Sequence, residues 1–299
     1  MTTTSTFDRA MAQVSAGEPL SASDMADLAS APDILPLGML ADAARRRVHG
    51  TQVTYVRVAC CAFDRSFSGA VSPVAREVRI TGVPPGIDVA VEAVRSARAA
   101  AGERTVSGFS WLDVERLAGH DAAAVSRALD HLRAAGLDAL AEIPLDAVAD
   151  PAGAVERLAG AGFAQLRLSI ARAAAAERLP LLLAAAELQA RCACIQAINP
   201  LSSVMSPLRP TTGYEDVKMV ALARLCAPAI PNVQVDWSRY GPKLAQVALT
   251  FGADDLDAVS PSDEAPDGRR RAPLEEVRRN IEAAGFLPAE RDGRFTVIA

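Results

Sequence analysis

The sequence predicts an α/β protein: a (β/α)8 TIM-like barrel with a helical N-terminal extension and a reduced first βα unit. From residue 53 onward, apolar runs rich in β-branched residues alternate with alanine-rich helical runs, which is typical of a parallel sheet. Eight such units are the number that closes a barrel. A chain of 299 residues, half of them hydrophobic, can bury a core of that size.

Three helical segments come before the alternating region. The first covers about residues 7–15, the second follows Ser21, a good N-cap with Asp24 three residues on, and the third covers about 35–47 before Gly50. These observations divide the chain into a helical extension (1–50), a barrel (51–285) and a C-terminal tail (286–299).

The barrel elements follow in order. The predicted strands are Val53–Cys60, Glu77–Val83, Arg104–Trp111, Leu137–Ile143, Phe163–Ile170, Cys192–Ile198, Asn232–Trp237 and Asp255–Val259. The predicted helices between and after them are Ile87–Ala101, Ala122–Ala135, Pro151–Ala161, Ala173–Ala190, Tyr214–Ala227, Pro242–Phe251 and Leu274–Ala284.

The first connection is too short for its place in such a barrel. Little beyond residues 66–76, with Gly69 and Pro73, separates the first two strands. A parallel crossover usually needs a dozen or more residues including its helix. The first barrel helix is therefore predicted to be vestigial or absent.

The segment VTYVRVACCAFDR (53–65) runs from a buried strand into two adjacent cysteines, Cys60 and Cys61. A strand followed by a cysteine loop is one way to hold an iron–sulfur cluster, but a cluster needs several thiolates. Neighbouring strand residues point to opposite faces, so this pair is poorly placed to bind one metal centre together.

Charge and composition exclude several classes of protein. The net charge of −5 and the interspersed basic residues predict no nucleic-acid partner. The N-terminus lacks the pattern of a secretory signal, and the longest apolar run is too short to span a membrane, so a cytoplasmic protein is expected. Five irregularly spaced cysteines predict no disulfide framework.

Several segments together resemble the radical SAM enzymes of futalosine-dependent menaquinone biosynthesis. They are PDILPLGMLADAARRRVHG (32–50), REVRITGV (76–83), AAAVSRALDHLRAAGLDALAEI (122–143), RPTTGYEDVKMVALARL (209–225), NVQVDW (232–237), GPKLAQVALTFGADDLDA (241–258) and EEVRRNIEAAGFLPAERD (275–292). The GADDLD and AERD segments are most similar to aminofutalosine synthase, among relatives that include cyclic dehypoxanthinylfutalosine synthase and the deazaflavin cofactor synthases.

This resemblance implies a barrel enzyme that binds a [4Fe–4S] cluster through C-x3-C-x2-C and cleaves SAM to a radical. Cys61 then corresponds to the third cluster cysteine, as a vestigial cluster position, while Cys60 stands where the family has Phe and the loop with the first two cysteines is missing. The glycine pair that ends the family's second strand is replaced here by Thr81-Gly82-Val83. Residues 166–179 read LRLSIARAAAAERL where the family has a histidine- and glutamate-bearing turn, and residues 198–208 lack the family's aromatic and histidine residues.

Two segments carry candidate substrate-binding residues at the carboxyl ends of strands, where active sites lie in this fold. Arg209, Thr211 and Tyr214 follow the sixth strand, although Thr212 and its neighbours also fit an N-cap. Trp237, Arg239 and Lys243 follow the seventh, and a positive pair there suits a small anionic ligand as well as a helix start.

The remaining cysteines leave a metal site open as an alternative. Cys192 and Cys194 are two apart on a predicted strand, so they face the same way and, if inward, would approach Cys61. The simpler interpretation is that all five cysteines are small buried hydrophobic residues.

The sequence therefore favours a degenerate homologue of aminofutalosine synthase, non-catalytic or repurposed, that acts in or beside menaquinone biosynthesis as a ligand-binding or partner subunit. No cofactor is expected, and the partners are an intact paralogue, a second copy or a small anionic ligand. Two alternatives stay open. One is an active enzyme with an atypical [4Fe–4S] site and SAM, and the other is a cluster-free barrel enzyme acting on an anionic small molecule.

Overall fold

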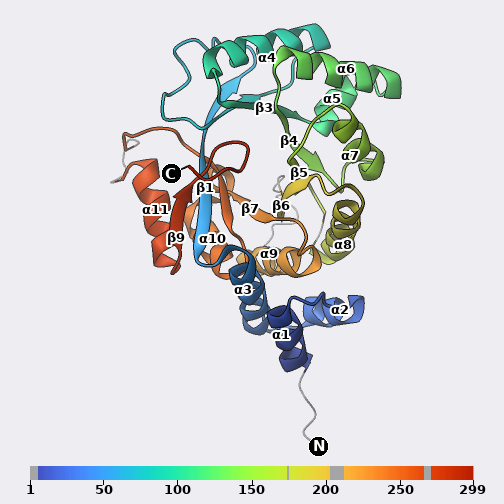
Figure 1. Ribbon diagram of the computed structural model, residues 1–299, viewed down its shortest axis with the longest axis vertical. Helices are drawn as coiled ribbons and strands as arrows, with labels where there is room; N and C mark the ends of the chain where they lie inside the picture. The colour runs from blue at the N-terminus through green and yellow to red at the C-terminus, as the bar shows by residue number, and fades with distance from the viewer. Residues whose placement is uncertain (1–5, 174, 203–211, 266–270, 299) are drawn as a thin grey trace, which may run out of the picture.

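A parallel β-barrel forms the centre of the molecule. The computed structural model describes residues 6–173, 175–202, 212–265 and 271–298. Strands β2 to β8 pair in chain order, β8 pairs with β1, and β1 pairs with β2, which closes the barrel and confirms the predicted fold class (Figure 1). The barrel strands are β1 (Gln52–Ala62), β2 (Glu77–Thr81), β3 (Thr105–Ser110), β4 (Ala139–Pro144), β5 (Leu166–Ile170), β6 (Ile195–Ser202), β7 (Asn232–Asp236) and β8 (Asp255–Val259).

Helices cover the outside of the barrel (Figure 1). They are α4 (Ile87–Ala101), α5 (Trp111–Leu117), α6 (Ala122–Ala135), α7 (Pro151–Gly160), α8 (Ala175–Cys192), α9 (Gly213–Cys226), α10 (Trp237–Thr250) and α11 (Pro273–Ala283). All the predicted barrel helices are present within a few residues, and α5 is an addition. It begins at Ser110, which makes a reciprocal capping box with Asp113 and so ends β3 before Trp111.

The connection from β1 to β2 contains no helix. Residues 63–76 form turns and irregular backbone, held to the barrel by the buried Phe67 and by the Arg76 N–H, which donates to the Arg57 carbonyl at 2.8 Å. The first helix after β1 is therefore α4, which follows β2. The prediction of a reduced first βα unit is confirmed.

The N-terminal helices α1 (Thr6–Ala16), α2 (Ala22–Ser30) and α3 (Leu35–His49) lie to one side of the barrel, against α9 (Figure 1). The Tyr214 hydroxyl and the Lys218 ammonium of α9 donate to the carbonyls of Pro32 and Ala31 between α2 and α3. Arg45 of α3 is fully buried and donates to the Gln52 carbonyl at the start of β1. Among the described residues, no helix is long and apolar enough to cross a membrane.

The C-terminal segment closes the amino-terminal end of the barrel. Its first part forms β9 (Leu287–Glu290), a strand that the sequence did not predict and that pairs in parallel with the start of β1. Arg291 then forms a bidentate ion pair with Asp255, at 2.6 and 2.7 Å, at the start of β8. The Gly293 carbonyl accepts from Arg167 at 3.1 Å, so this segment reaches the interior of the barrel.

Candidate functional site

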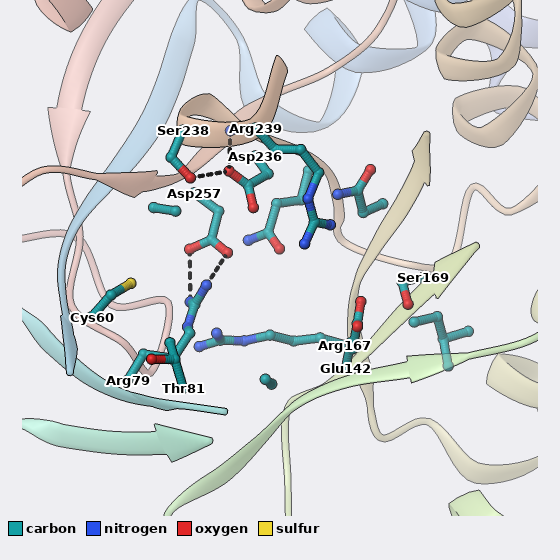
Figure 2. A pocket seen from close by; sticks show the side chains of 15 residues that line it. Cys60, Arg79, Thr81, Glu142, Arg167, Ser169, Asp236, Ser238, Arg239 and Asp257 are labelled. Atoms are coloured by element: carbon teal, nitrogen blue, oxygen red, sulfur yellow. Dashed lines mark hydrogen bonds and ion pairs between the residues drawn. The ribbon is translucent and has the colours of Figure 1, made fainter. Parts of the chain in front are cut away.

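A polar cavity of about 260 Å³ opens at the carboxyl end of the barrel strands (Figure 2). This is the end at which ligand sites are built in barrels of this type. The cavity is lined by Cys60, Arg79, Thr81, Ala141, Glu142, Arg167, Leu168, Ser169, Asn199, Gln234, Asp236, Ser238, Arg239, Asp257 and Ala258.

Glu77 lies fully buried beneath this cavity and is bound on three sides. Arg167 donates to both of its carboxylate oxygens, at 2.9 and 3.0 Å, Arg79 donates at 2.7 Å, and the Ser107 hydroxyl donates at 2.5 Å. Burial opposes ionisation of Glu77, but the two guanidinium groups outweigh it and hold the pKa of this carboxyl well below its usual range. The cavity floor is therefore a fixed ion cluster.

Asp257 of β8 completes that cluster through a bidentate pair with Arg79, at 2.8 and 2.9 Å. Burial raises the pKa of Asp257, but the Arg79 charge overcomes this and the net shift is downward. Two arginines and two carboxylates thus balance in charge, so the cluster needs no additional ion.

Two buried donors on β5 face the cavity and have no hydrogen-bond partner among the described residues. They are the Nε–H of Arg167 and the hydroxyl of Ser169, each in a residue only 3% exposed. Since burial of an unsatisfied donor costs about 1–3 kcal/mol, a ligand oxygen placed here would recover that energy. Figure 2 shows Glu142 and Ser169 on one wall, Cys60 on the opposite side, and Arg239 reaching in from the rim.

Of the two adjacent cysteines, Cys60 faces the cavity and Cys61 does not. Cys60 is exposed and lines the mouth near Arg79, whereas Cys61 is 8% exposed and packs in the hydrophobic core outside the barrel wall. Burial raises the pKa of both thiols, and Arg79 only partly opposes this at Cys60. The sequence predicted Cys61 as the residue at the cofactor position, but the Cys61 side chain points away from the mouth.

The other predicted binding residues are dispersed. Arg239 lines the cavity, but Trp237 is buried in the hydrophobic core at the start of α10 and Lys243 is exposed on that helix, outside the cavity lining. Tyr214 is 44% exposed and its hydroxyl binds the Pro32 carbonyl, away from the mouth. Arg209 and Thr211 lie outside the described residues.

The capping interpretation of the neighbouring threonine is confirmed. Thr212 accepts from the Glu215 N–H at 3.2 Å, and Glu215 binds the Thr212 N–H in return, so α9 starts with a capping box.

Comparison with known proteins places the C-terminal part of this chain. Residues 198–298 match the family described as the CofH/MqnC C-terminal region. The match spans the sixth to eighth barrel units and β9, including Asn199, Gln234, Asp236, Arg239 and Asp257 of the cavity.

Curated relatives of this family agree over a similar length. The chain is 39% identical over 95 residues to the 5-amino-6-(D-ribitylamino)uracil–L-tyrosine 4-hydroxyphenyl transferase of Archaeoglobus fulgidus, which is 29% of this chain and 27% of that protein. It is 34% identical over 93 residues to the aminodeoxyfutalosine synthase of Streptomyces coelicolor, which is 29% of this chain and 24% of that protein. The matches thus span about a quarter of these relatives.

Solved structures extend the likeness in fold to the whole chain. Methylornithine synthase superposes with a TM-score of 0.69 at 14% identity, covering 94% of this chain and 97% of that one. The FeFe-hydrogenase maturase HydG from Carboxydothermus hydrogenoformans also gives 0.69, at 12% identity, covering 97% of this chain and 80% of that one. At these identities the likeness concerns the fold alone.

The residues at the end of β1 do not match the cluster that a radical SAM enzyme of the CofH/MqnC type implies. A [4Fe–4S] cluster is held by cysteine thiolates, and here Cys60 faces the mouth without a second cysteine in the 63–76 connection. Among the described residues, no group of three or more His, Cys, Asp or Glu side chains is arranged to hold a metal ion. The residues present therefore do not fit this cofactor.

The alternative of a site made by Cys61, Cys192 and Cys194 is wrong in its geometry. The predicted strand from Cys192 begins instead at Ile195, since Cys192 is the last residue of α8. Cys194 therefore lies before the amino-terminal end of β6, whereas Cys61 lies near the carboxyl end of β1. Parallel strands place these positions at opposite ends of the barrel.

The inward-facing ion cluster was not predicted, although the sequence carries a signal for it. Glu77 and Arg79 are two residues apart in an otherwise apolar strand, as are Arg167 and Ser169. Polar side chains with this period share one strand face, and in a closed barrel with apolar residues packed outside, that face is the interior.

Proposed function

We propose that this chain is a homologue of CofH/MqnC enzymes that has lost the cluster-binding loop and uses its barrel mouth to bind a small ligand without radical chemistry. By relation to aminodeoxyfutalosine synthase, we place it in or beside menaquinone biosynthesis, as a ligand-binding subunit or as the partner of an intact paralogue or of a second copy. A cytoplasmic location fits this role.

The β1–β2 connection carries the proposal. Its fourteen residues, from Phe63 to Arg76, contain neither a cysteine nor a helix. Of the cysteines in the described residues, Cys60 is the one that lines the cavity. The barrel itself is closed and its interior is charged. Absence of the cluster loop from an intact barrel fits loss of a cofactor better than loss of the fold.

The cavity itself supports retention of ligand binding. Arg167 Nε and the Ser169 hydroxyl offer buried donors, Arg239 adds a cation at the rim, and Glu142 offers an acceptor on the same wall as Ser169. A small ligand bearing a carboxylate or carbonyl oxygen, with a donor group nearby, satisfies these side chains. An apolar ligand would leave the buried donors unpaired.

Anaerobic reconstitution with iron and sulfide tests the loss of the cluster. We expect substoichiometric iron that is unchanged in the Cys60→Ala and Cys61→Ala variants, and no reductive cleavage of SAM. A stoichiometric [4Fe–4S] spectrum that disappears in either variant, together with SAM cleavage, would instead establish the active enzyme with an atypical cluster.

Thermal-shift screening tests the binding role. SAM, aminofutalosine and simple aryl carboxylates are suitable probes, and Ser169→Ala and Arg239→Ala are the informative variants. A binder of the proposed kind shifts the wild-type midpoint and shifts these variants less. Lys243→Ala is the matched control because Lys243 lies outside the cavity lining, so its response should equal that of the wild type. If none of the probes shifts the wild type and an intact paralogue co-purifies, the partner role is favoured instead.

A cluster-free enzyme acting on an anionic small molecule is the second candidate. It is favoured by the Cys60 thiol and the Glu142 carboxylate, which face one cavity together with Arg239. A nucleophile or proton carrier and an anion-binding cation are components of such a site. Turnover of an aryl carboxylate that Cys60→Ala or Glu142→Gln abolishes would support this candidate over a binding subunit.

A further inference from the structure

A pair of cysteines, Cys192 and Cys194, lies at the end of the barrel opposite to the ligand cavity. Cys192 ends α8, Cys194 precedes β6, and both are partly buried against the hydrophobic core while retaining access to solvent. The Cys194 carbonyl accepts from the Leu166 N–H at 2.9 Å, which fixes this turn beside the start of β5.

The backbone between the two cysteines has an unusual conformation. Ala193 has φ of 50°, in the left-handed region that residues with a Cβ rarely adopt. This residue lies between the end of α8 at Cys192 and the start of β6 at Ile195, with one cysteine on each side of it. A strained residue persists only where its surroundings hold it.

Gln189 supplies that support. Its backbone carbonyl accepts from the Ala193 N–H at 2.9 Å, and its side-chain oxygen accepts from the Ile195 N–H at 2.9 Å. Its amide group donates to the Ala229 carbonyl at 3.1 Å, which ties the turn to the connection between α9 and β7. The C-A-C turn is thus held on both sides of Ala193.

The Cys192 thiol lies beside that of Cys194. Burial and a hydrogen bond with the Cys192 thiol raise the pKa of Cys194 to about 12. A soft cation that replaces the thiol protons would supply the positive charge that two adjacent thiolates need.

The ligand set decides which cation fits. Thiolates are soft ligands that select Cu(I), Zn(II) or iron–sulfur clusters over Mg(II) and Ca(II). Structural zinc requires four ligands and a cluster requires several cysteines, yet no third His, Cys, Asp or Glu joins this pair among the described residues. Of these soft metal centres, the one that two sulfur ligands can hold is a monovalent cation.

We propose that Cys192 and Cys194 form a two-coordinate site for a monovalent soft metal ion of the Cu(I) class. Binding converts two thiols and one cation into a bis-thiolate complex with a single negative charge, and it releases two protons to solvent. No electron is transferred. The site is independent of the barrel mouth and of the function proposed for it.

Competition for Cu(I) tests the site on the full-length, reduced protein under anaerobic conditions. Cu(I) is supplied as its bicinchoninate complex, and loss of the chelate colour reports transfer. We expect one Cu(I) per chain. The affinity for Cu(I) should fall in Cys192→Ser and in Cys194→Ser by more than roughly 10- to 100-fold, which is the usual cost of losing a residue that only hydrogen-bonds to a metal ligand. Cys60→Ala and Cys226→Ala should bind as the wild type does.

Two further readouts keep the test decisive if a variant folds poorly. X-ray absorption of the loaded wild-type protein should show two sulfur neighbours and no nitrogen or oxygen. Apparent affinity should rise about a hundredfold per pH unit near neutrality, since two protons leave. No transfer to the wild type, equal transfer to the double Cys192→Ser/Cys194→Ser variant, or a coordination sphere with other ligands would overturn the site. None of these results bears on cluster loading at the mouth.

Discussion

At the scale of single residues, Glu77 is the carboxylate on which the barrel interior depends. It is fully buried and binds Arg79 and Arg167 together. Glu77→Gln would leave two buried guanidinium groups short of one negative charge. We expect this variant to lose about 3–5 kcal/mol of unfolding free energy, the usual cost of breaking a buried ion pair from one side.

Chemical denaturation at neutral pH measures this effect. Glu156→Gln is the matched control because Glu156 pairs with Arg191 at 2.7 Å on the surface, where both side chains are more than half exposed. Removing that pair should cost at most about 1 kcal/mol. Equal losses in the two variants would show that the interior pairs contribute no more than a surface pair.

The same carboxylates make the fold sensitive to acid. The folded pKa values of Glu77 and Asp257 lie below their ordinary values, despite burial, because of Arg167 and Arg79. Their contribution is therefore complete above the unfolded pKa values, about 4, and is lost as the pH falls toward the folded ones. The stability of Glu77→Gln should fall less steeply below about pH 4 than that of the wild type.

The two adjacent cysteines should differ in reactivity. Cys60 is exposed at the mouth, whereas Cys61 and Cys226 are each 8% exposed. Alkylation of the folded protein should therefore modify Cys60 and spare the other two until unfolding, as peptide mass spectrometry can show. The thiolate is the reactive form and burial raises the Cys60 pKa, so the rate should still be rising above pH 9. Modification of Cys61 before Cys60 would contradict this orientation.

This difference marks what the sequence could and could not predict about the site. That the connection after Cys60 and Cys61 is short and lacks a helix follows from the sequence, and the structure confirms it. Which thiol faces inward does not follow, because residues on both faces of β1 are buried and the apolar pattern has no period of two. Arg239 was predicted as a site residue because it lies just after a strand. Arg79 and Arg167 lie inside strands and were not recognised as site residues.

At the scale of elements, the alternation of helices and strands was predictable since each barrel unit repeats the same apolar pattern. The errors lie where a local interaction overrides it. Ser110 and Asp113 convert the expected strand end at Trp111 into α5, and the Ala193 turn separates Cys194 from α8. β9 escaped prediction because it is only four residues long and its side chains are exposed or half-buried.

Asp146 illustrates a loop held by one side chain. It follows β4, and its carboxylate accepts from three successive N–H groups after β5, those of residues 171, 172 and 173, at 2.6, 2.6 and 2.7 Å. The next loop therefore depends on it, close to Ser169 of the cavity. Asp146→Ala should cost about 1–3 kcal/mol and speed amide exchange at these residues.

Asp150→Ala is the control for this element. Asp150 caps α7 by accepting one N–H, from Gly153 at 2.9 Å, and its loss should cost about 1 kcal/mol. Exchange at residues 171–173 should be unaffected in this variant. If Asp146→Ala is no more destabilising than Asp150→Ala, the three hydrogen bonds do not act together.

At the scale of the whole molecule, β1 joins the parts of the fold. Its first half pairs with β8 and β9, and its second half pairs with β2 without an intervening helix. The C-terminal segment thus belongs to the barrel structurally. Arg167 donates to the Gly293 carbonyl at the closed end of the barrel and also lines the cavity. It therefore connects the C-terminal segment to the ligand site.

Gly293 tests this closure, because its backbone lies against the start of β3. A Cβ added at Gly293 would lie 2.5 Å from the Thr105 Cβ, closer than atoms can pack. Gly293→Ala should therefore push the segment away and cost about 1–3 kcal/mol. Gly160→Ala is the control, since its Cβ would meet nothing within 4 Å, and it should change stability by no more than about 0.5 kcal/mol. In a double-mutant cycle, Thr105→Gly should relieve part of the cost, whereas strict additivity would mean that the two residues do not touch.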